Sequence, residues 1–255
     1  MKVTEQLKKE NLIVRIFEDE TSAGEASAQF VAEQLNNAIR KKGFANLILA
    51  TGASQFAFID ALKKQEIDWG KITVFHLDEY KDLPETHPAS FRKYLKERIL
   101  NVVKPYKVYY IQGDAPDIEK EISQYEDLLK THPVDIACIG IGENGHIAFN
   151  DPAVADFNDT HLVKVVQLDD ACRRQQLGEG WFPTFEAVPE EAVSLTIPAI
   201  MHCKVISCMV PDRRKAQAVY DTLNTKISTA CPATILRKHA NTVLFLDKNS
   251  ASKLK

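Results

Sequence analysis

Short apolar runs rich in β-branched residues alternate with longer amphipathic runs along most of this 255-residue chain. Buried parallel strands need continuous apolar stretches, and the helices that cover them need one apolar face, so the alternation is typical of βαβ units. It predicts an α/β fold built on a mostly parallel sheet. Strands are expected at 12–17, 46–51, 72–80, 107–112, 134–142, 192–197, 203–211 and 242–247, and helices at 22–42, 54–65, 88–100, 116–130 and 212–224.

The segment 150–191 interrupts this rhythm. It is rich in Asp, Arg, Gln, Gly and Pro, and a long insertion of this kind inside a compact domain is often a lid or a binding loop. We expect it to be irregular. No linker divides the chain, and 45% hydrophobic residues can supply one large core, so a single domain is expected over 1–255.

Composition excludes several classes of partner. A net charge of −3 offers no broad basic surface, so nucleic acid is not expected. No stretch is long and apolar enough for a signal peptide or a membrane span, so no membrane association is expected. The five cysteines are scattered without a C-x-x-C pair, which indicates reduced thiols in a cytoplasmic protein rather than disulfides or a zinc site.

The stretch GIGENG at 140–145 fits the dinucleotide fingerprint G-x-G-x-x-G. A nucleotide site also needs a sizeable helix directly after the third glycine. Here HIAFNDP follows, and Pro152 ends any helix within about two turns. The context therefore argues against a nucleotide site.

An alternative is that these glycines bend the chain so that His146 is displayed among the polar residues Glu143, Asn144 and Asp151. A histidine oriented by a carboxylate is suited to moving protons on a substrate oxygen. A structural histidine is the simpler alternative, but its position at a strand end favours the functional interpretation.

Other strand ends carry candidate ligand groups, because ligands of open α/β sheets gather at the carboxyl ends of the strands. The small residues Thr51, Gly52, Ala53 and Ser54 could present backbone N–H groups to an anion, although Ser54 could equally cap the following helix. Asp78 could be a general base, but on its motif alone an acidic loop start is the simpler interpretation.

Two basic clusters are candidates for binding an anionic group. Lys215 lies at the start of an expected helix, where a cation opposes the helix dipole, which favours recruitment for anion binding over a solvated turn. Arg173 and Arg174 lie in the insertion, and guanidinium groups suit phosphate.

Taken together, the chain resembles the glucosamine-6-phosphate deaminase (isomerase) family, which is related to the 6-phosphogluconolactonases. The resemblance is carried by LDEY at 77–80, GIGENGHIAFNDP at 140–152, the ATGAS turn and VPDRRKA at 210–216, in matching order. It implies a doubly wound, Rossmann-like sheet, a sugar-phosphate substrate, and no metal or organic cofactor. Members are often homo-oligomers, so the resemblance leaves a homo-oligomer open for this chain.

The resemblance also implies residue roles. Asp78 would shuttle the proton between C2 and C1 of the sugar, and His146 would open the ring with Asp151 orienting it. The 51–54 turn and Lys215 would hold the 6-phosphate, with Arg173 or Arg174 as a further contributor. Three positions depart from the family pattern: Asn144 stands where some members have Asp, Asp151 where Glu is common, and the segment around Arg173 does not match residue for residue.

The expected activity is conversion of glucosamine 6-phosphate and water into fructose 6-phosphate and ammonia. The departures leave galactosamine 6-phosphate open as the substrate. A 6-phosphogluconolactonase is a further alternative, against which the Ile147–Asn150 continuation and Asp78 speak. A non-catalytic sugar-phosphate sensor would have no use for a base at position 78.

Overall fold

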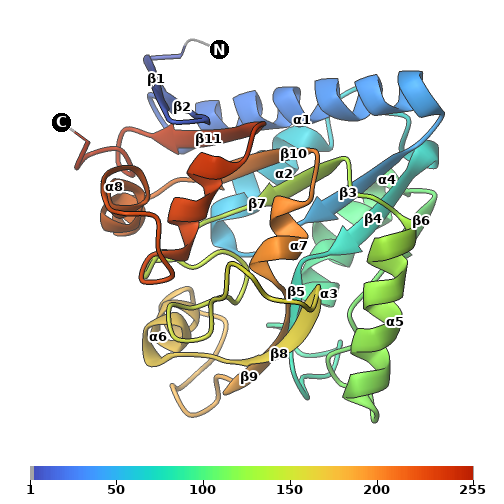
Figure 1. Ribbon diagram of the computed structural model, residues 1–255. Coiled ribbons are helices and arrows are strands. Elements are labelled where there is room, and N and C mark those ends of the chain that lie inside the picture. Colours follow the sequence, from blue (N-terminus) through green and yellow to red (C-terminus); the bar gives the residue numbers. More distant parts are fainter. Residues whose placement is uncertain (1–2, 255) are drawn as a thin grey trace.

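The computed structural model describes residues 3–254 and is built on an eight-stranded sheet (Figure 1). The strand order is β1-β2-β11-β10-β7-β3-β4-β6, and every neighbouring pair is parallel except β1 and β2. This confirms the mostly parallel sheet. The strands are β1 (Glu5–Lys9), β2 (Leu12–Phe17), β3 (Ala45–Leu49), β4 (Ile72–His76), β6 (Lys107–Tyr109), β7 (Ile136–Ile139), β10 (Val205–Val210) and β11 (Thr242–Asp247).

Helices cover both faces of this sheet, as a doubly wound fold requires. Successive side chains of a strand point to opposite faces, so Leu47 and Leu49 pack with the helices of one face while Ile48 packs with those of the other. On the first face lie α1 (Glu20–Lys42) and α2 (Phe56–Leu62). On the second lie α5 (Ile118–Thr131), α7 (Ile197–Met201) and α8 (Ala216–Asn224).

The long helix α1 shows how local sequence sets an element's ends. Asp19 caps its start by accepting a hydrogen bond from the Ser22 amide at 2.8 Å. Gly43 closes its end with a φ of 86°, a left-handed conformation that favours glycine. The helix thus begins two residues before the expected 22 and ends at the expected 42.

The expected strand 72–80 is wrong in one respect, because the chain changes sheets after His76. Its last part, β5 (Asp78–Tyr80), pairs antiparallel with β9 (Glu191–Leu195) in a separate three-stranded sheet completed by β8 (Val163–Gln167). The Leu195 amide also donates to the Leu77 carbonyl at 3.1 Å. The apolar run continues through the switch because both sheets are buried there.

The expectation of an irregular 150–191 segment is also wrong. It contains β8 and the helix α6 (Asp170–Gly178), whose start is capped by Asp169 accepting from the Cys172 amide at 2.7 Å. Three of the four residues that α6 buries, Arg173, Gln175 and Gln176, are polar, so the sequence shows no apolar helical stripe there. The N-terminal strand β1 was likewise not expected, since its mostly exposed residues, EQLKK, show no apolar face.

Three shorter helical pieces follow β5: α3 (Phe91–Leu95), a π-helical turn at Lys96–Leu100 and α4 (Asn101–Val103). Within residues 3–254, no helix has the length and apolar character needed to cross a bilayer.

Candidate active site

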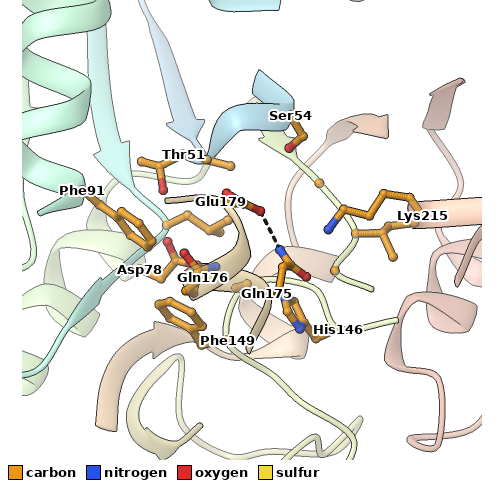
Figure 2. Close-up of a pocket in the computed structure, with 17 residues that line it drawn as sticks. Thr51, Ser54, Asp78, Phe91, His146, Phe149, Gln175, Gln176, Glu179 and Lys215 are labelled. Carbon is orange, nitrogen blue, oxygen red and sulfur yellow. Dashed lines mark hydrogen bonds between the residues drawn. The ribbon is translucent and has the colours of Figure 1, made fainter. Parts of the chain in front are cut away.

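One pocket lies where the carboxyl ends of four adjacent parallel strands, β10, β7, β3 and β4, meet (Figure 2). Each strand runs into a segment that contributes to it, and α6 and α3 supply further residues. The lining residues are Ala50, Thr51, Gly52, Ser54, Leu77, Asp78, Phe91, Gly140, Ile141, Gly142, His146, Ala148, Phe149, Gln175, Gln176, Glu179 and Lys215. The fold therefore brings together side chains that are far apart in the sequence.

His146 and Asp151 form an oriented pair beneath the pocket. The His146 Nδ1 atom lies 2.8 Å from Asp151 Oδ1, and the Asp151 side chain is fully buried. With Nδ1 engaged by the carboxylate, Nε2 is left to act on a ligand. Burial alone would raise the pKa of Asp151, but its contacts with His146 and Asn144 hold that pKa below its usual value.

Asn144 does not line the pocket but ties this pair to the start of α6. Its Nδ2 group donates to Asp151 Oδ1 at 2.9 Å and to Asp169 Oδ2 at 3.0 Å. Its Oδ1 atom accepts from the His146 amide at 3.1 Å. An aspartate here would place three carboxylates in contact, so the amide suits this arrangement.

The glycines of GIGENG make room for the histidine ring. A Cβ on Gly142 would lie 2.2 Å from the His146 ring, and one on Gly145 would lie 2.6 Å from the Cys231 sulfur. Gly145 also has a φ of +85°. No helix starts at this turn, so these glycines form a histidine cradle rather than a nucleotide loop.

Asp78 is the second titratable group in the pocket. It is 6% exposed, and within residues 3–254 its carboxylate has no hydrogen-bond partner. Burial, reinforced by the neighbouring charge of Glu79, raises its pKa to about 8. A carboxylate with a pKa near neutrality is a competent general base and, once protonated, a competent acid.

The buried ion pair of Glu79 and Arg92, which sequence reasoning missed, holds the strand next to Asp78 in place. The Glu79 carboxylate accepts from the amides of Phe91 and Arg92 at 3.1 and 2.9 Å and from Arg92 Nε at 3.2 Å. The Arg92 side chain is 2% exposed. Since Glu79 adjoins Asp78 on β5, this pair fixes the strand that carries the base.

The 51–54 turn and Lys215 lie on the other side of the pocket. Gly52 has a φ of +98°, and its carbonyl accepts a hydrogen bond from the Tyr94 hydroxyl at 2.9 Å. Ser54 caps neither helical piece here, so its hydroxyl, which accepts from Gln55 Nε2 at 3.1 Å, is available to a ligand. Ala53 contributes its backbone rather than its side chain.

Lys215 is 4% exposed, and within residues 3–254 its ammonium group has no ion pair or hydrogen bond. Burial lowers its pKa, while the charges of Glu179 and Glu143 act in the opposite direction. Figure 2 shows its side chain reaching toward the space between the turn and α6. An anionic ligand group there would supply the missing partner.

The structure does not bring Arg173 or Arg174 to the pocket. The Arg173 guanidinium donates to the carbonyls of Phe185 and Val188 at 3.1 and 2.9 Å and lies over the Phe185 ring. The exposed Arg174 is 4.0 Å from Asp170. Arg173 therefore ties α6 to the segment around Phe185 and Val188 that follows it.

The helix α6 instead presents Gln175, Gln176 and Glu179, which sequence reasoning missed. Gln176 Oε1 accepts from the Tyr80 hydroxyl at 2.8 Å, and Gln175 Nε2 donates to Glu179 Oε1 at 3.0 Å. The i, i+4 spacing of Gln175 and Glu179 could have placed both on one helical face, but only once α6 was recognised as a helix.

One group among the described residues offers three potential metal ligands within 4.8 Å of one another: His146, Asp151 and Cys172. Burial raises the pKa of the Cys172 thiol well above its usual value, so the thiol is protonated and a poor ligand. With His146 Nδ1 only 2.8 Å from Asp151 Oδ1, the group fits an oriented histidine better than a metal site.

Comparison with known proteins finds relatives that match most of the chain. A family model described as glucosamine-6-phosphate isomerases/6-phosphogluconolactonase matches residues 18–245. A glucosamine-6-phosphate deaminase of Bacillus cytotoxicus is 34% identical over 219 residues, covering 86% of this chain and 81% of the relative. One of Streptococcus uberis is 32% identical over 243 residues, covering 95% and 99%.

Solved structures show the same relationship. A monomeric glucosamine-6-phosphate deaminase superposes with a TM-score of 0.85 at 28% identity, covering 94% of this chain and 98% of that one. The 6-phosphogluconolactonase of Trypanosoma brucei, with a TM-score of 0.79 at 16% identity over 98% and 100% of the two chains, shares the fold. The chain belongs to the glucosamine-6-phosphate isomerase/6-phosphogluconolactonase family.

Proposed function

We propose that this chain is a glucosamine-6-phosphate deaminase, which converts glucosamine 6-phosphate and water into fructose 6-phosphate and ammonia. The observation that carries the proposal is the presence, in one pocket, of a buried carboxylate with a pKa of about 8 and a histidine oriented by a carboxylate. An aldose–ketose conversion needs a base at C2 and a proton carrier at the ring oxygen. The curated relatives that cover most of the chain carry the same activity in their names.

The reaction begins with ring opening at His146. Nε2 takes the proton of the C1 hydroxyl and returns a proton to the ring oxygen, which breaks the bond between C1 and that oxygen. Asp151 holds the ring and stabilises the transient imidazolium, as the 2.8 Å contact allows. Asn144 keeps Asp151 in place.

Asp78 then moves the proton that defines the isomerisation. Its carboxylate removes the proton from C2 and delivers it to C1, while a proton of the amino group passes to the C1 oxygen, which leaves an imine at C2. Water adds to this imine, the carbon–nitrogen bond breaks, and ammonia leaves carrying both protons of that water. The pKa near 8 lets one group act first as a base and then as an acid.

The 51–54 turn and Lys215 hold the 6-phosphate. Thr51 and Ser54 offer hydroxyls, Gly52 and Ala53 offer backbone N–H groups, and Lys215 supplies a buried positive charge. Fixing the phosphate sets the register of C1 and C2 over Asp78. We propose that the reaction needs no metal or organic cofactor. The five free cysteines are consistent with a cytoplasmic location. Any assembly would be a homo-oligomer of this chain.

The test is substrate specificity. Glucosamine 6-phosphate, galactosamine 6-phosphate and 6-phosphogluconolactone are supplied in turn, and ammonia, ketose phosphate and acid are followed. Ammonia from glucosamine 6-phosphate supports the proposal, ammonia from the galactosamine epimer alone reassigns the substrate, and acid from the lactone alone makes the chain a lactonase.

The roles are tested with Asp78→Asn. The rate should fall by a factor of about 10² to 10⁴, the range that general acid–base catalysis contributes, while phosphate binding persists. Asp82→Asn is the matched control, because Asp82 is an exposed carboxylate four residues further along the chain and lies outside the pocket. An Asp78→Asn protein with most of its rate would place the base elsewhere.

A further inference from the structure

Glu179 places a carboxylate on the turn that the proposed function assigns to the substrate phosphate. Its Oε2 atom lies 3.5 Å from the Ala53 amide, which donates a long hydrogen bond to it. The same atom would lie 3.8 Å from a Cβ built on Gly52. A negatively charged group of this chain therefore lies beside the backbone N–H groups that would receive the phosphate.

The Glu179 carboxylate is held from two further sides. Trp181 Nε1 donates to Oε2 at 3.2 Å, and Gln175 Nε2 donates to Oε1 at 3.0 Å, the contact drawn in Figure 2. Trp181 in turn packs edge-on against Tyr94, whose hydroxyl donates to the Gly52 carbonyl. The carboxylate thus joins the end of α6 to the 51–54 turn.

Lys215 lines the same pocket and adds a buried cation to this anion site. Glu179 and Lys215 line the same pocket, but they are too far apart to form an ion pair. A phosphate contacting both the turn and Lys215 would bring a second negative charge next to Glu179. Two anionic groups cannot share one set of N–H donors without strong repulsion.

Glu179 lies in a part of the chain where the backbone has room to move. It is half-buried between Gly178 and Gly180, and a Cβ on either glycine would meet no atom within 4 Å. Gly180 has a φ of +81° directly after the end of α6. The two glycines leave room for the backbone to move, so the carboxylate can leave the turn by breaking its hydrogen bonds with the Ala53 amide, Trp181 and Gln175.

We propose, building on the proposed function, that Glu179 is a displaceable occupant of the phosphate subsite and that its carboxylate joins the end of α6 to the 51–54 turn. The substrate phosphate displaces the carboxylate and takes its place on the Ala53 amide and beside Lys215. A sugar without a phosphate lacks the charge to do so, which makes Glu179 a residue that selects for phosphorylated substrates.

The competition has a measurable consequence. A subsite that is open in one tenth of the molecules binds its ligand about tenfold more weakly than one that is always open. Glu179→Gln keeps the size of the side chain and removes its charge, and Glu179→Ala removes the acceptor altogether. Both variants should bind phosphate more tightly than the wild type.

The experiment measures the dissociation constant of inorganic phosphate by calorimetry, and KM and kcat for glucosamine 6-phosphate, in the wild type and both variants. We expect the dissociation constant and KM to fall about tenfold in each variant. Glu186→Gln is the matched control, because it removes one charge from an exposed position of the same segment and should leave both constants unchanged.

Three results would overturn the inference: an unchanged or weaker phosphate affinity in both Glu179 variants, an equal gain in Glu186→Gln, or no phosphate binding to any of the four proteins. A merely structural role for Glu179 predicts a loss of affinity together with a lower melting temperature. If the wild type binds phosphate but releases no ammonia, the proposed function fails, while the comparison of phosphate affinities still decides the role of Glu179.

Discussion

At the scale of single residues, the environment of Asp78 determines how the site responds to pH. Its pKa of about 8 results from burial and from the adjacent Glu79 carboxylate, without any hydrogen bond to relieve it. The protonated form therefore predominates at pH 7 in the free chain. A base that must first lose a proton limits the rate over the neutral range.

The first prediction concerns the pH profile of the rate. Since Asp78 must be ionised to remove the C2 proton, kcat/KM should rise with pH from 6 and level off above about 8. The measurement is ammonia release at low substrate concentration between pH 6 and 9. A profile that is flat from pH 6 to 8 would mean that Asp78 is not the group whose ionisation controls the reaction.

The second prediction concerns stability. The folded pKa of about 8 lies above the ordinary aspartate pKa of about 4, so the folded chain binds more protons than the unfolded chain between these values. The contribution of Asp78 to the free energy of unfolding therefore falls as pH rises from about 4 to about 8. In Asp78→Asn the side chain at position 78 does not titrate, so the variant keeps the stability that the wild type loses as pH rises.

Urea unfolding of both proteins at pH 5 and pH 8.5 measures the effect. The free energy of unfolding of Asp78→Asn, relative to the wild type, should be higher at pH 8.5 than at pH 5 by at least about 1 kcal/mol, the scale of one pKa unit. The titrating groups that do not interact with Asp78 are common to both proteins and cancel. An equal difference at both pH values would contradict the raised pKa.

At the scale of elements, the loop after β7 depends on its glycines for room. Gly142→Ala would place a methyl group 2.2 Å from the His146 ring, so the ring must leave its contact with Asp151. We expect a loss of kcat of about 10² or more, because a misplaced catalytic group is costly. Gly70→Ala is the control, since its Cβ would meet only ordinary contacts, and a Gly142→Ala enzyme of normal rate would rule out the cradle.

The link between β5 and α3 depends on one buried ion pair. Arg92→Met would leave the Glu79 carboxylate buried without its cation, which should lower the free energy of unfolding by about 3–5 kcal/mol. Lys93→Met removes a cation from the exposed pair with Glu97 on the same helix and should cost less than about 1 kcal/mol. Urea unfolding compares the two, and equal losses would show that burial of the pair is unimportant.

The elements also show where sequence patterns are informative. The strands of the central sheet from 12–17 to 242–247 were predictable because buried strands require apolar runs. The helix α6 was not, because three of the four residues that it buries are polar. The strand β8 was missed although three of its five residues are valine, because it is a short run inside a polar segment. The split between β4 and β5 leaves no local mark, since both strands are buried.

At the scale of the whole molecule, all five cysteines are buried and free. Burial raises the pKa of the thiols of Cys138 and Cys208, so neither exposure nor ionisation favours reaction in the folded chain. A thiol reagent at pH 8 should therefore modify them only at the rate of unfolding, and all five at once in denaturant. Rapid modification of one thiol in the native protein would reveal local opening around it.

A single domain and a homo-oligomer remain predictions about the whole molecule. One solved relative is described as monomeric, so the assembly of this chain is a matter for light scattering of the purified protein. A mass near 28.7 kDa would indicate a monomer.

The sequence by itself determined the mostly parallel sheet, the glycine turn that displays His146, and the candidates Lys215 and the 51–54 turn. These follow from local rules, because apolar runs, glycine turns and strand ends are properties of neighbouring residues. The doubly wound arrangement and the roles of Asp78 and Asp151 came from the resemblance to a known family. Only the tertiary structure decided that Arg173 donates to the carbonyls of Phe185 and Val188 while Glu179 faces the pocket. Which polar side chain of a short helix points inward depends on what packs against it, and that is set by β5, β9 and Tyr94, segments distant in the sequence.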